Sequence, residues 1–403
     1  MSTSILYHGF GVRGYKYLKT EYRAGAVVFH IEKAAEKQCC AVCGSHSVIK
    51  KGGVVREVRT LPIGGKKVFL ALHLHRLLCR SCGALRLEPL LVAFAKKRWT
   101  KALGRYVVEL LRRATVQDVA MHLGMSWDTV KQIHSWALKR KFKRRRIKQL
   151  RYIGVDEIAV RKGHHYLTVV VDLRTGQVVW VAEGRTIESL EPFLRRLKRA
   201  RAPIEAIAMD MWPAYISAVL KHYCYKVIVF DRYHVVADCN KVIDELRRQE
   251  AAAASKDDEP VYKGVRYLLL KGGEKIKDGT KARAKLERLL SLNQSLNTAY
   301  IMKEELRALW NCDSRHEAED YLSNWLQKAW ASAIPLLKQF ANKLAAHRTG
   351  LLNYFDHRIT TGKVEGLNNK IKVLKRQAYG YRNIDYFKLR IYFLHESRYA
   401  LIG

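Results

Sequence analysis

Residues 152–183 read YIGVDEIAVRKGHHYLTVVVDLRTGQVVWVAE. The segment contains three runs rich in β-branched and aromatic residues, which are typical of strands. The runs are Tyr152–Ile158, Tyr166–Leu173 and Gln177–Ala182, with turns at Gly163 and at Arg174-Thr175-Gly176. Because tight turns join neighbouring strands, this pattern predicts a three-stranded antiparallel meander.

After this meander the pattern alternates between helix and strand. Ile187–Ala200 has amphipathic helical spacing, Ile204–Asp210 is strand-like, Pro213–His222 is helical, and Lys226–Asp231 is strand-like again. Such alternation indicates parallel strands with crossover helices. Three antiparallel strands followed by this run have the element order of a ribonuclease-H-like fold.

Two carboxylates fall on strands that this fold makes neighbours. Asp156 lies in the first strand and Asp210 ends the fourth. A carboxylate that closes an apolar strand is costly unless it is paired or binds a cation. Glu365, within GKVEGLNN at 362–369, opens a long helix and supplies a third acid. Three such oxygen ligands suit Mg²⁺ or Mn²⁺, and two ions roughly 4 Å apart could activate a water or a 3′-hydroxyl.

Residues near the third acid extend this prediction. Asn369 and Lys372 follow Glu365 by four and seven residues, so they share its helical face, and we expect Lys372 to hold a phosphate. Other interpretations stay open. Each acid alone could be a cap or a salt-bridged residue. Glu157, predicted to point to the opposite face of its strand, and Asp172 and Asp231, which end strands, are rival acids.

Cysteines are paired in the N-terminal part. Cys40-x-x-Cys43-Gly and Cys79-x-x-Cys82-Gly flank a predicted hairpin, with strands at Val54–Val58 and Lys67–His75 and a turn at 62–65. Four thiolates suit one structural Zn²⁺ with tetrahedral geometry. Rival ligands are His46, His73 and His75, and Cys39 is a spare thiol.

A helix-turn-helix pattern follows. Thr115 is a predicted N-cap with Asp118 three residues later, Gly124 permits a turn, and Ser126 caps a second helix with Val130, Ile133 and Trp136 facing inward. An ordinary helical hairpin is the alternative. Eight of the ten residues at 139–148 are basic, which favours contact with a DNA backbone. The predicted DNA-binding residues are Trp127, Thr129, Lys131, Gln132, Lys139, Arg140, Lys141, Lys143, Arg144, Arg145 and Arg146.

These segments predict a multidomain α+β protein. Residues 240–350 read almost wholly as helix, which indicates an all-α insertion. The expected parts are a zinc-binding domain at 1–95, a helix-turn-helix domain with a basic linker at 96–150, the first part of a ribonuclease-H-like catalytic domain at 151–240, the insertion at 241–355, and the C-terminal catalytic part at 356–403.

Composition narrows the class of partner. The 403 residues include 74 Lys and Arg against 37 Asp and Glu, a net charge of +37, which indicates attraction to a polyanion such as nucleic acid. We find no apolar run of the roughly 18 residues needed for a membrane span, and no signal peptide. The sequence therefore predicts a cytoplasmic protein whose eight cysteines are thiols or metal ligands.

The whole chain resembles the ISL3 family of bacterial insertion-sequence transposases. The blocks that carry the resemblance are the two cysteine pairs, Gly154-Val155-Asp156-Glu157, Met209-Asp210-Met211-Trp212-Pro213-Ala214-Tyr215, Phe230-Asp231-Arg232-Tyr233-His234-Val235 and Lys363-Val364-Glu365-Gly366-Leu367-Asn368-Asn369. By this resemblance Asp156, Asp210 and Glu365 are the catalytic DDE triad. Asp231 and His234 belong to a motif beside the active site, with a helix-capping histidine as the alternative for His234.

The resemblance also implies an activity. We expect binding of terminal inverted repeats in double-stranded DNA, cleavage at the element ends and transfer of 3′-hydroxyls into target DNA, by a homodimer or larger assembly on the bacterial nucleoid. Trp310, Trp325 or Trp330 could stack on an unpaired base, although helix core is the simpler role. A ribonuclease-H-like nuclease or resolvase and a non-catalytic DNA-binding regulator are the alternative functions.

Overall fold

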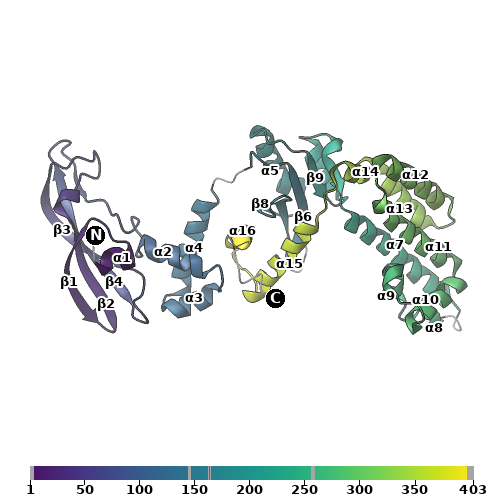
Figure 1. Cartoon of the computed structure of the whole chain (residues 1–403), viewed down its shortest axis with the longest axis horizontal. Helices are drawn as coiled ribbons and strands as arrows, with labels where there is room; N and C mark the ends of the chain where they lie inside the picture. The colour runs from purple at the N-terminus through teal and green to yellow at the C-terminus, as the bar shows by residue number, and fades with distance from the viewer. Residues whose placement is uncertain (1–3, 144–146, 162, 164, 256–258, 397–403) are drawn as a thin grey trace. The chain divides into compact units, whose positions relative to one another are not determined.

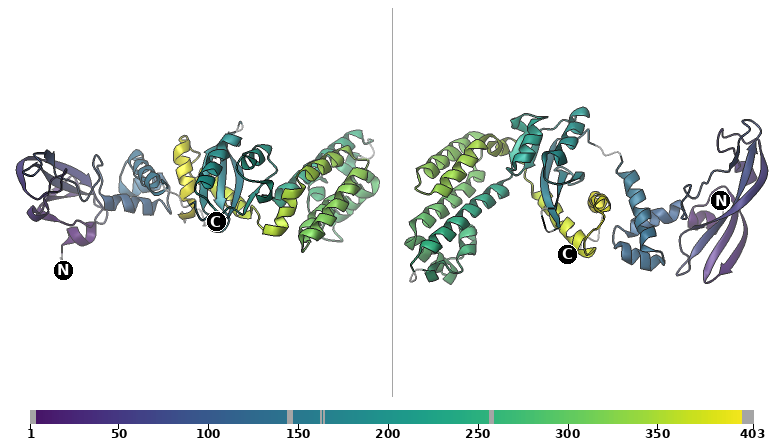
Figure 2. Two further views of the ribbon diagram at one scale, coloured as in Figure 1. Left: turned by 90° about the horizontal axis from the view of Figure 1, so that it is seen from above. Right: turned by 180° about the vertical axis from the view of Figure 1, so that it is seen from behind.

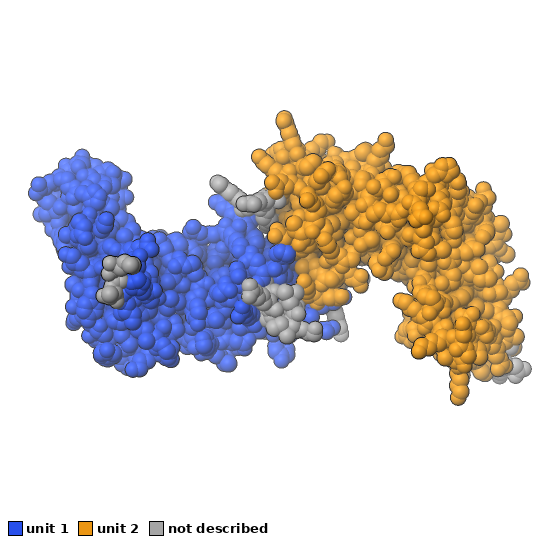
Figure 3. Space-filling model, in the orientation of Figure 1, with its two compact units in different colours: residues 1–144, 372–403 blue, residues 145–371 orange. Residues whose placement is uncertain are grey.

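The computed structural model describes residues 4–143, 147–161, 163, 165–255 and 259–396 (Figure 1). The chain divides into two compact units, residues 1–144 with 372–403 and residues 145–371 (Figure 3). Among the described residues, no helix is long and apolar enough to cross a membrane. The fold is a mixed α/β one with two five-stranded sheets.

A mixed sheet opens the first unit. Its strands are β1 (Tyr15–Arg23), β2 (Ala26–Lys33), β3 (Val48–Arg59), β4 (Val68–Cys79) and β5 (Leu85–Leu87), in the order β1-β2-β4-β3 with β5 on β4. Helix α1 (Ile5–Phe10) shares one apolar core with this sheet, and its Phe10 ring lies 5.8 Å from the Phe29 ring of β2. The β3–β4 hairpin matches the prediction and is longer than predicted. The β1–β2 hairpin was not predicted, although its turn at Ala24-Gly25 has positive φ at both residues.

Three helices form the predicted helix-turn-helix region: α2 (Lys101–Leu110), α3 (Val116–Leu123) and α4 (Trp127–Lys141). Thr115 and Asp118 form a reciprocal capping box, Gly124 ends α3 in the left-handed region, and the Ser126 side chain caps α4. Val130 and Ile133 are fully buried, as predicted, whereas Trp136 is half-buried. Local capping chemistry therefore fixes both helix starts.

The C-terminal tail packs on this region. Helix α16 (Ile384–Phe393) places the Tyr386 hydroxyl 2.8 Å from Nδ1 of His134, and the Phe393 ring lies 5.0 Å from the His134 ring. Burial lowers the pKa of His134 well below its usual range, so the ring is neutral and can accept this bond. Residues 372–403 are therefore grouped with the first unit in space, and the assignment of 356–403 to the C-terminal catalytic part stays a prediction.

The second unit is built on the predicted ribonuclease-H-like sheet. Its strands are β6 (Tyr152–Arg161), β7 (His165–Asp172), β8 (Val178–Glu183), β9 (Ala206–Met209) and β10 (Ile228–Phe230), in the order β10-β9-β6-β7-β8. The first three pair antiparallel, and β9 and β10 join in parallel. Helices α5 (Ile187–Arg199) and α6 (Pro213–Leu220) make the crossovers. This order confirms the fold class.

A helical insertion follows β10. Its helices lie side by side in all three views (Figures 1 and 2). They are α7 (Arg232–Ala253), α8 (Glu259–Tyr262), α9 (Arg266–Leu270), α10 (Lys281–Leu292), α11 (Gln294–Ala308), α12 (Arg315–Ala331), α13 (Pro335–Ala346) and α14 (Arg348–His357), with short 3-10 turns at Gly273–Lys275 and Leu309–Asn311. One apolar core runs from the sheet into these helices, so the insertion is packed on the sheet.

Helix α15 (Gly362–Gln377) crosses the sheet at Gly154 of β6. A Cβ atom at position 154 would lie 2.5 Å from Cγ2 of Val364 and 2.9 Å from Cδ2 of Leu173. Real Cβ atoms do not approach other atoms this closely, so the helix can pack here only against glycine.

We predict that Gly154→Ala lowers the free energy of unfolding by about 1–3 kcal/mol, because the added methyl group overpacks the strand–helix contact. Chemical denaturation followed by circular dichroism measures this change. Gly366→Ala is the matched control on α15, since nothing lies within 4 Å of its added Cβ. The control should be neutral or stabilising by up to about 1 kcal/mol. Equal effects of the two substitutions would contradict the packing argument.

Candidate active site and nucleic-acid interface

Three acids stand level at one edge of the ribonuclease-H-like sheet. In the parallel pairs, Gly154 lies opposite Ala208, and Phe230 lies opposite Met209. Asp156 follows Gly154 by two residues, Asp210 follows Ala208 by two, and Asp231 follows Phe230. The register therefore brings Asp156, in the middle of β6, level with Asp210 and Asp231, which follow the carboxyl ends of β9 and β10.

Asp156 is held from two sides. Its Oδ1 accepts a hydrogen bond from the backbone N–H of Glu157 at 2.8 Å, and its Oδ2 accepts one from Nδ2 of Asn368 at 2.8 Å. Burial raises the pKa of Asp156 to about 6, and the negative charge of Asp210 adds to this rise. Burial also raises the pKa of Asp210, whose Oδ1 accepts from the N–H of Trp212. The two acids therefore lie within electrostatic reach of each other.

Asp231 has a different role from the other two acids. It is buried at the start of α7, where one oxygen accepts from the N–H of Tyr233 and the other accepts from the N–H of Thr361. Nδ1 of His234 lies 3.2 Å from Asp231 Oδ2. This hydrogen bond raises the pKa of His234 to about 9, with further rises from Asp156 and Asp210. His234 is therefore a cation beside the acids.

Glu157 lies closer to the site than the sequence indicated. Strand alternation predicted that its side chain points away from Asp156. However, burial and then the charges of Asp210 and Asp156 raise the pKa of Glu157 to about 7. Arg185 Nη1 lies 3.9 Å from the Glu157 carboxylate. Glu157 thus belongs to the electrostatic cluster, whereas Asp172 is occupied by the turn after β7, where it accepts from the N–H of Arg174.

Glu365, the predicted third acid, is on α15, the same helix that carries Asn368. It is exposed in the first turn of α15, and no hydrogen bond or ion pair joins it to Asp156 or Asp210 among the described residues. Asn369 and Lys372 are exposed on the same helix. The inward residue is Asn368, which is buried and hydrogen-bonded to Asp156. The apolar stripe Val364, Leu367 and Ile371 marks this inward face in the sequence, so Asn368 could have been found there.

The donor set fits a divalent cation with oxygen ligands. Oε2 of Glu157 and Oδ1 of Asn368 are buried and have no hydrogen-bond partner among the described residues. Unpartnered buried oxygens beside carboxylates of raised pKa are the environment that a hard cation stabilises. Among the described residues, the acids do not come within 4.8 Å of one another as a group of three.

The four predicted cysteine ligands converge. The Sγ atoms of Cys40, Cys43, Cys79 and Cys82 all lie within 4.8 Å of one another. The rival histidines bind elsewhere: His46 to the carbonyl of Gln38, His73 to His30, and His75 to Glu32. Four thiolates at this spacing suit tetrahedral Zn²⁺.

Part of the predicted DNA-reading helix lines a basic groove, which we define by Arg56, Arg59, Lys96, Arg98, Thr129 and Gln132. Its end beside α4 is about 350 Å³ and continues along β3 and β4 as a hollow of about 590 Å³. Arg59 lies over the Phe69 ring and donates to the carbonyl of Leu123, joining the sheet to α3. The one acid of the lining, Glu57, is bound by Arg23.

The other predicted DNA-binding residues that the structure describes do not line this groove. Lys131 covers the rings of Trp127 and Tyr386. Arg140 covers the rings of Trp136 and Phe94, and Lys141 is paired with Glu396 at 2.6 Å. Lys139 and Lys143 are exposed. Arg144, Arg145 and Arg146 lie outside the described residues.

The three insertion tryptophans differ in exposure. Trp325 is core, 2% exposed, and its indole N–H donates to the carbonyl of Met302. Trp330 is 42% exposed and donates to Asn342. Trp310 is 6% exposed and lines a pocket.

Similarity to known proteins covers the whole of this architecture. A family model for the DDE transposase domain of the ISL3 type matches residues 153–391. A model described as the zinc-finger of transposases IS204/IS1001/IS1096/IS1165 matches residues 36–82, and one described as the helix-turn-helix domain of transposase family ISL3 matches residues 95–133.

Two curated relatives match most of the chain. The transposase for insertion sequence element IS1001 of Bordetella parapertussis is 34% identical over 389 residues, covering 96% of this chain and 95% of the relative. The transposase for IS1557 of Mycobacterium tuberculosis is 30% identical and covers 87% and 84%. The Drosophila P element transposase strand transfer complex is a structural match with a TM-score of 0.41 and 12% identity over 74% of this chain and 92% of that one. The sequence matches show that the chain belongs to the ISL3 family of transposases.

Proposed function

We propose that this chain is a DDE transposase that binds the terminal inverted repeats of its insertion sequence and catalyses metal-dependent cleavage and strand transfer. The observation that carries the proposal is the hydrogen bond between Asn368 and Asp156. It places α15 at the sheet edge where Asp156 and Asp210 stand. Because residues three apart are neighbours on a helix, Glu365 lies beside Asn368 and can close on the same ions.

Each residue then has a role. Asp156, Asp210 and Glu365 would hold two Mg²⁺ or Mn²⁺ ions, which when bound activate the attacking water or 3′-hydroxyl and stabilise the leaving oxygen. His234 holds a positive charge beside the acids and suits contact with the scissile phosphate. Asp231 accepts hydrogen bonds from Tyr233 at the start of α7 and from Thr361 just before α15, and so holds both helix starts in position. Asn369 and Lys372, exposed on α15, suit contact with the DNA backbone.

The alternatives explain less of the molecule. A regulator without activity leaves the level acids and their raised pKa values unexplained. A nuclease or resolvase accounts for the acids but not for the zinc ribbon and helix-turn-helix that precede them. We expect the transposase to act as a homodimer or larger assembly on paired DNA ends in the cytoplasm, and light scattering of the DNA complex measures the number of chains.

The proposal predicts strand transfer by the purified protein with Mg²⁺ and a labelled duplex carrying its own element end. Asp156→Ala, Asp210→Ala and Glu365→Ala should each lower joining by at least about 100-fold, because each removes an electrostatic stabiliser of the transition state. DNA binding should survive in all three variants. Binding without cleavage by the unsubstituted protein would favour the regulator, and cleavage without joining would favour the nuclease.

Thermal unfolding separates metal binding from catalysis. The raised folded-state pKa values of Asp156 and Glu157 mean that their ionised forms oppose folding, so this cost grows as pH rises from about 4 to about 7 and is nearly complete above that. Mg²⁺ at pH 7.5 should therefore raise the Tm of the unsubstituted protein. The increase should be smaller in Asp156→Asn. An equal increase in both would place the ion elsewhere.

The cysteine cluster is assigned one structural Zn²⁺. Cys79→Ser should remove the bound zinc and lower the Tm of the first unit, because metal binding contributes folding free energy of about 10 kcal/mol in small zinc domains. Elemental analysis and thermal unfolding measure both changes. Cys39→Ser is the matched control and should keep one zinc per chain. Loss of zinc in both variants would contradict the assignment.

We propose that the cations of the basic groove bind the phosphate backbone of DNA. Thr129 and Gln132 would contact the neighbouring bases. Arg98→Ala should weaken binding to all DNA sequences and reduce the slope of log K against log salt by about 0.9. Gln132→Ala should instead reduce discrimination between bases by about 1–3 kcal/mol. Fluorescence anisotropy over a salt series measures both. Arg86→Ala, on β5 outside the groove, is the control, and a slope change equal to that of Arg98→Ala would contradict the assignment.

A further inference from the structure

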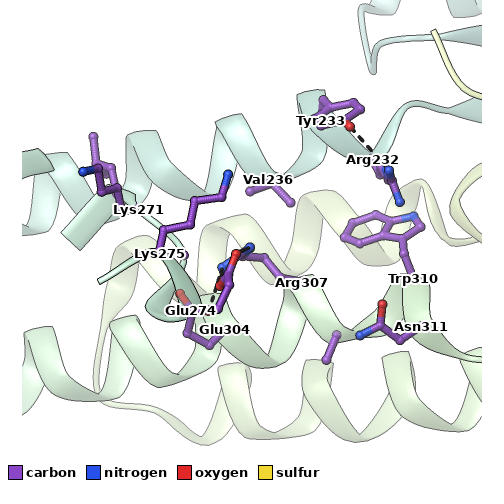
Figure 4. Close-up of a pocket in the computed structure, with 13 residues that line it drawn as sticks. Arg232, Tyr233, Val236, Lys271, Glu274, Lys275, Glu304, Arg307, Trp310 and Asn311 are labelled. Carbon is purple, nitrogen blue, oxygen red and sulfur yellow. Dashed lines mark hydrogen bonds and ion pairs between the residues drawn. The ribbon is translucent and has the colours of Figure 1, made fainter. Parts of the chain in front are cut away.

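The helical insertion contains a pocket of about 760 Å³ that the DDE chemistry does not use. Figure 4 shows the first turn of α7 and Trp310 on one side and the 271–275 segment with Arg307 on the other. We call it the insertion pocket, and its volume is in the range of small-ligand sites.

Aromatic groups form one wall of the insertion pocket. Trp310 is 6% exposed, and its Nε1 is buried without a hydrogen-bond partner among the described residues. Tyr233 is 54% exposed, with the Arg232 guanidinium 5.0 Å from its ring centroid. A buried unpaired N–H is costly unless a ligand accepts from it. The aromatic wall therefore favours a flat ligand that can stack on a ring.

The insertion pocket has more basic than acidic side chains in its lining. Arg307 is bound by both acids of the lining, Glu274 and Glu304. Arg232, Lys271 and Lys275 make no ion pair within 4 Å among the described residues. The pocket therefore presents positive charge beside an aromatic wall, which suits a ligand that is both aromatic and anionic.

One helical turn joins the insertion pocket to the acids. Asp231 and His234 face the carboxylate cluster, while Arg232, Tyr233 and Val236 line the pocket. Residues that line the pocket and residues of the proposed reaction centre therefore lie within one turn of the same helix.

We infer that the insertion pocket binds a single nucleotide unit, with its base against Trp310 and Tyr233 and its phosphate near Lys271 and Lys275. Two sources share this chemistry. One is an unpaired nucleotide of the DNA strand held at the acids, which rests on the proposed function. The other is a free mononucleotide, which does not.

The test uses the full chain in an Asp156→Ala background without divalent metal, so that binding is read apart from cleavage. One arm compares a duplex end containing one unpaired 2-aminopurine with the fully paired duplex, by anisotropy and 2-aminopurine quenching. The other arm titrates free AMP and ATP against tryptophan fluorescence. We expect about 10-fold tighter binding of the unpaired end, with quenching, as for one base–aromatic stack.

Matched variants make the result specific. Trp310→Phe and Lys275→Ala should each reduce the preference for the ligand several-fold, whereas Trp330→Phe and Lys281→Ala should not. Lys275 is exposed, so Lys275→Ala keeps the test open if Trp310→Phe fails to fold. A response to DNA alone assigns the strand as the source, and a response to mononucleotides alone assigns a free nucleotide. Equal affinity for both duplexes with no mononucleotide binding would overturn the inference, whatever the strand-transfer assay gives.

Discussion

The second unit depends on an electrostatic constraint, the gathering of like charges at one buried sheet edge. Asp156, Asp210 and Glu157 all have raised pKa values, because burial first and nearby negative charges second disfavour their ionised forms. The surroundings offset part of this cost through the amide of Asn368 and the cationic ring of His234. The remaining repulsion among the ionised acids would be relieved by a bound cation. The site is therefore suited to bind positive charge.

The first unit uses different physics. Arg59 joins the zinc ribbon to the helix-turn-helix, because it extends from β3 and donates a hydrogen bond to the carbonyl of Leu123 at the end of α3. The groove beside it collects cations from a strand and a loop, and hydrogen-bonding side chains from α4. Cationic and hydrogen-bonding side chains thus lie next to each other, an arrangement that would suit the proposed DNA recognition, in which phosphate contacts position the protein and base contacts specify the sequence.

Much of this could be predicted from the sequence because the signals are local. The strands from Tyr152 to Phe230 follow side-chain alternation, and the capping box at Thr115 uses neighbouring residues. Other features depend on tertiary contacts. The choice of Asn368 over Asn369 depends on which face of α15 meets β6, and the reach of Glu157 toward Asp210 depends on the bend and twist of strands. The attachment of α16 to α4 follows from His134 and Tyr386, 252 residues apart.

Asp231 ties together the two places where the chain leaves and re-enters the catalytic sheet. Its oxygens hold the start of α7 on one side and the N–H of Thr361, 130 residues later, on the other. The closure of this long excursion is thereby set by one side chain, and loop-closure entropy grows only slowly with length. A change in the length of the intervening helices would therefore add little loop-closure cost while Asp231 holds the same two ends of the sheet connection.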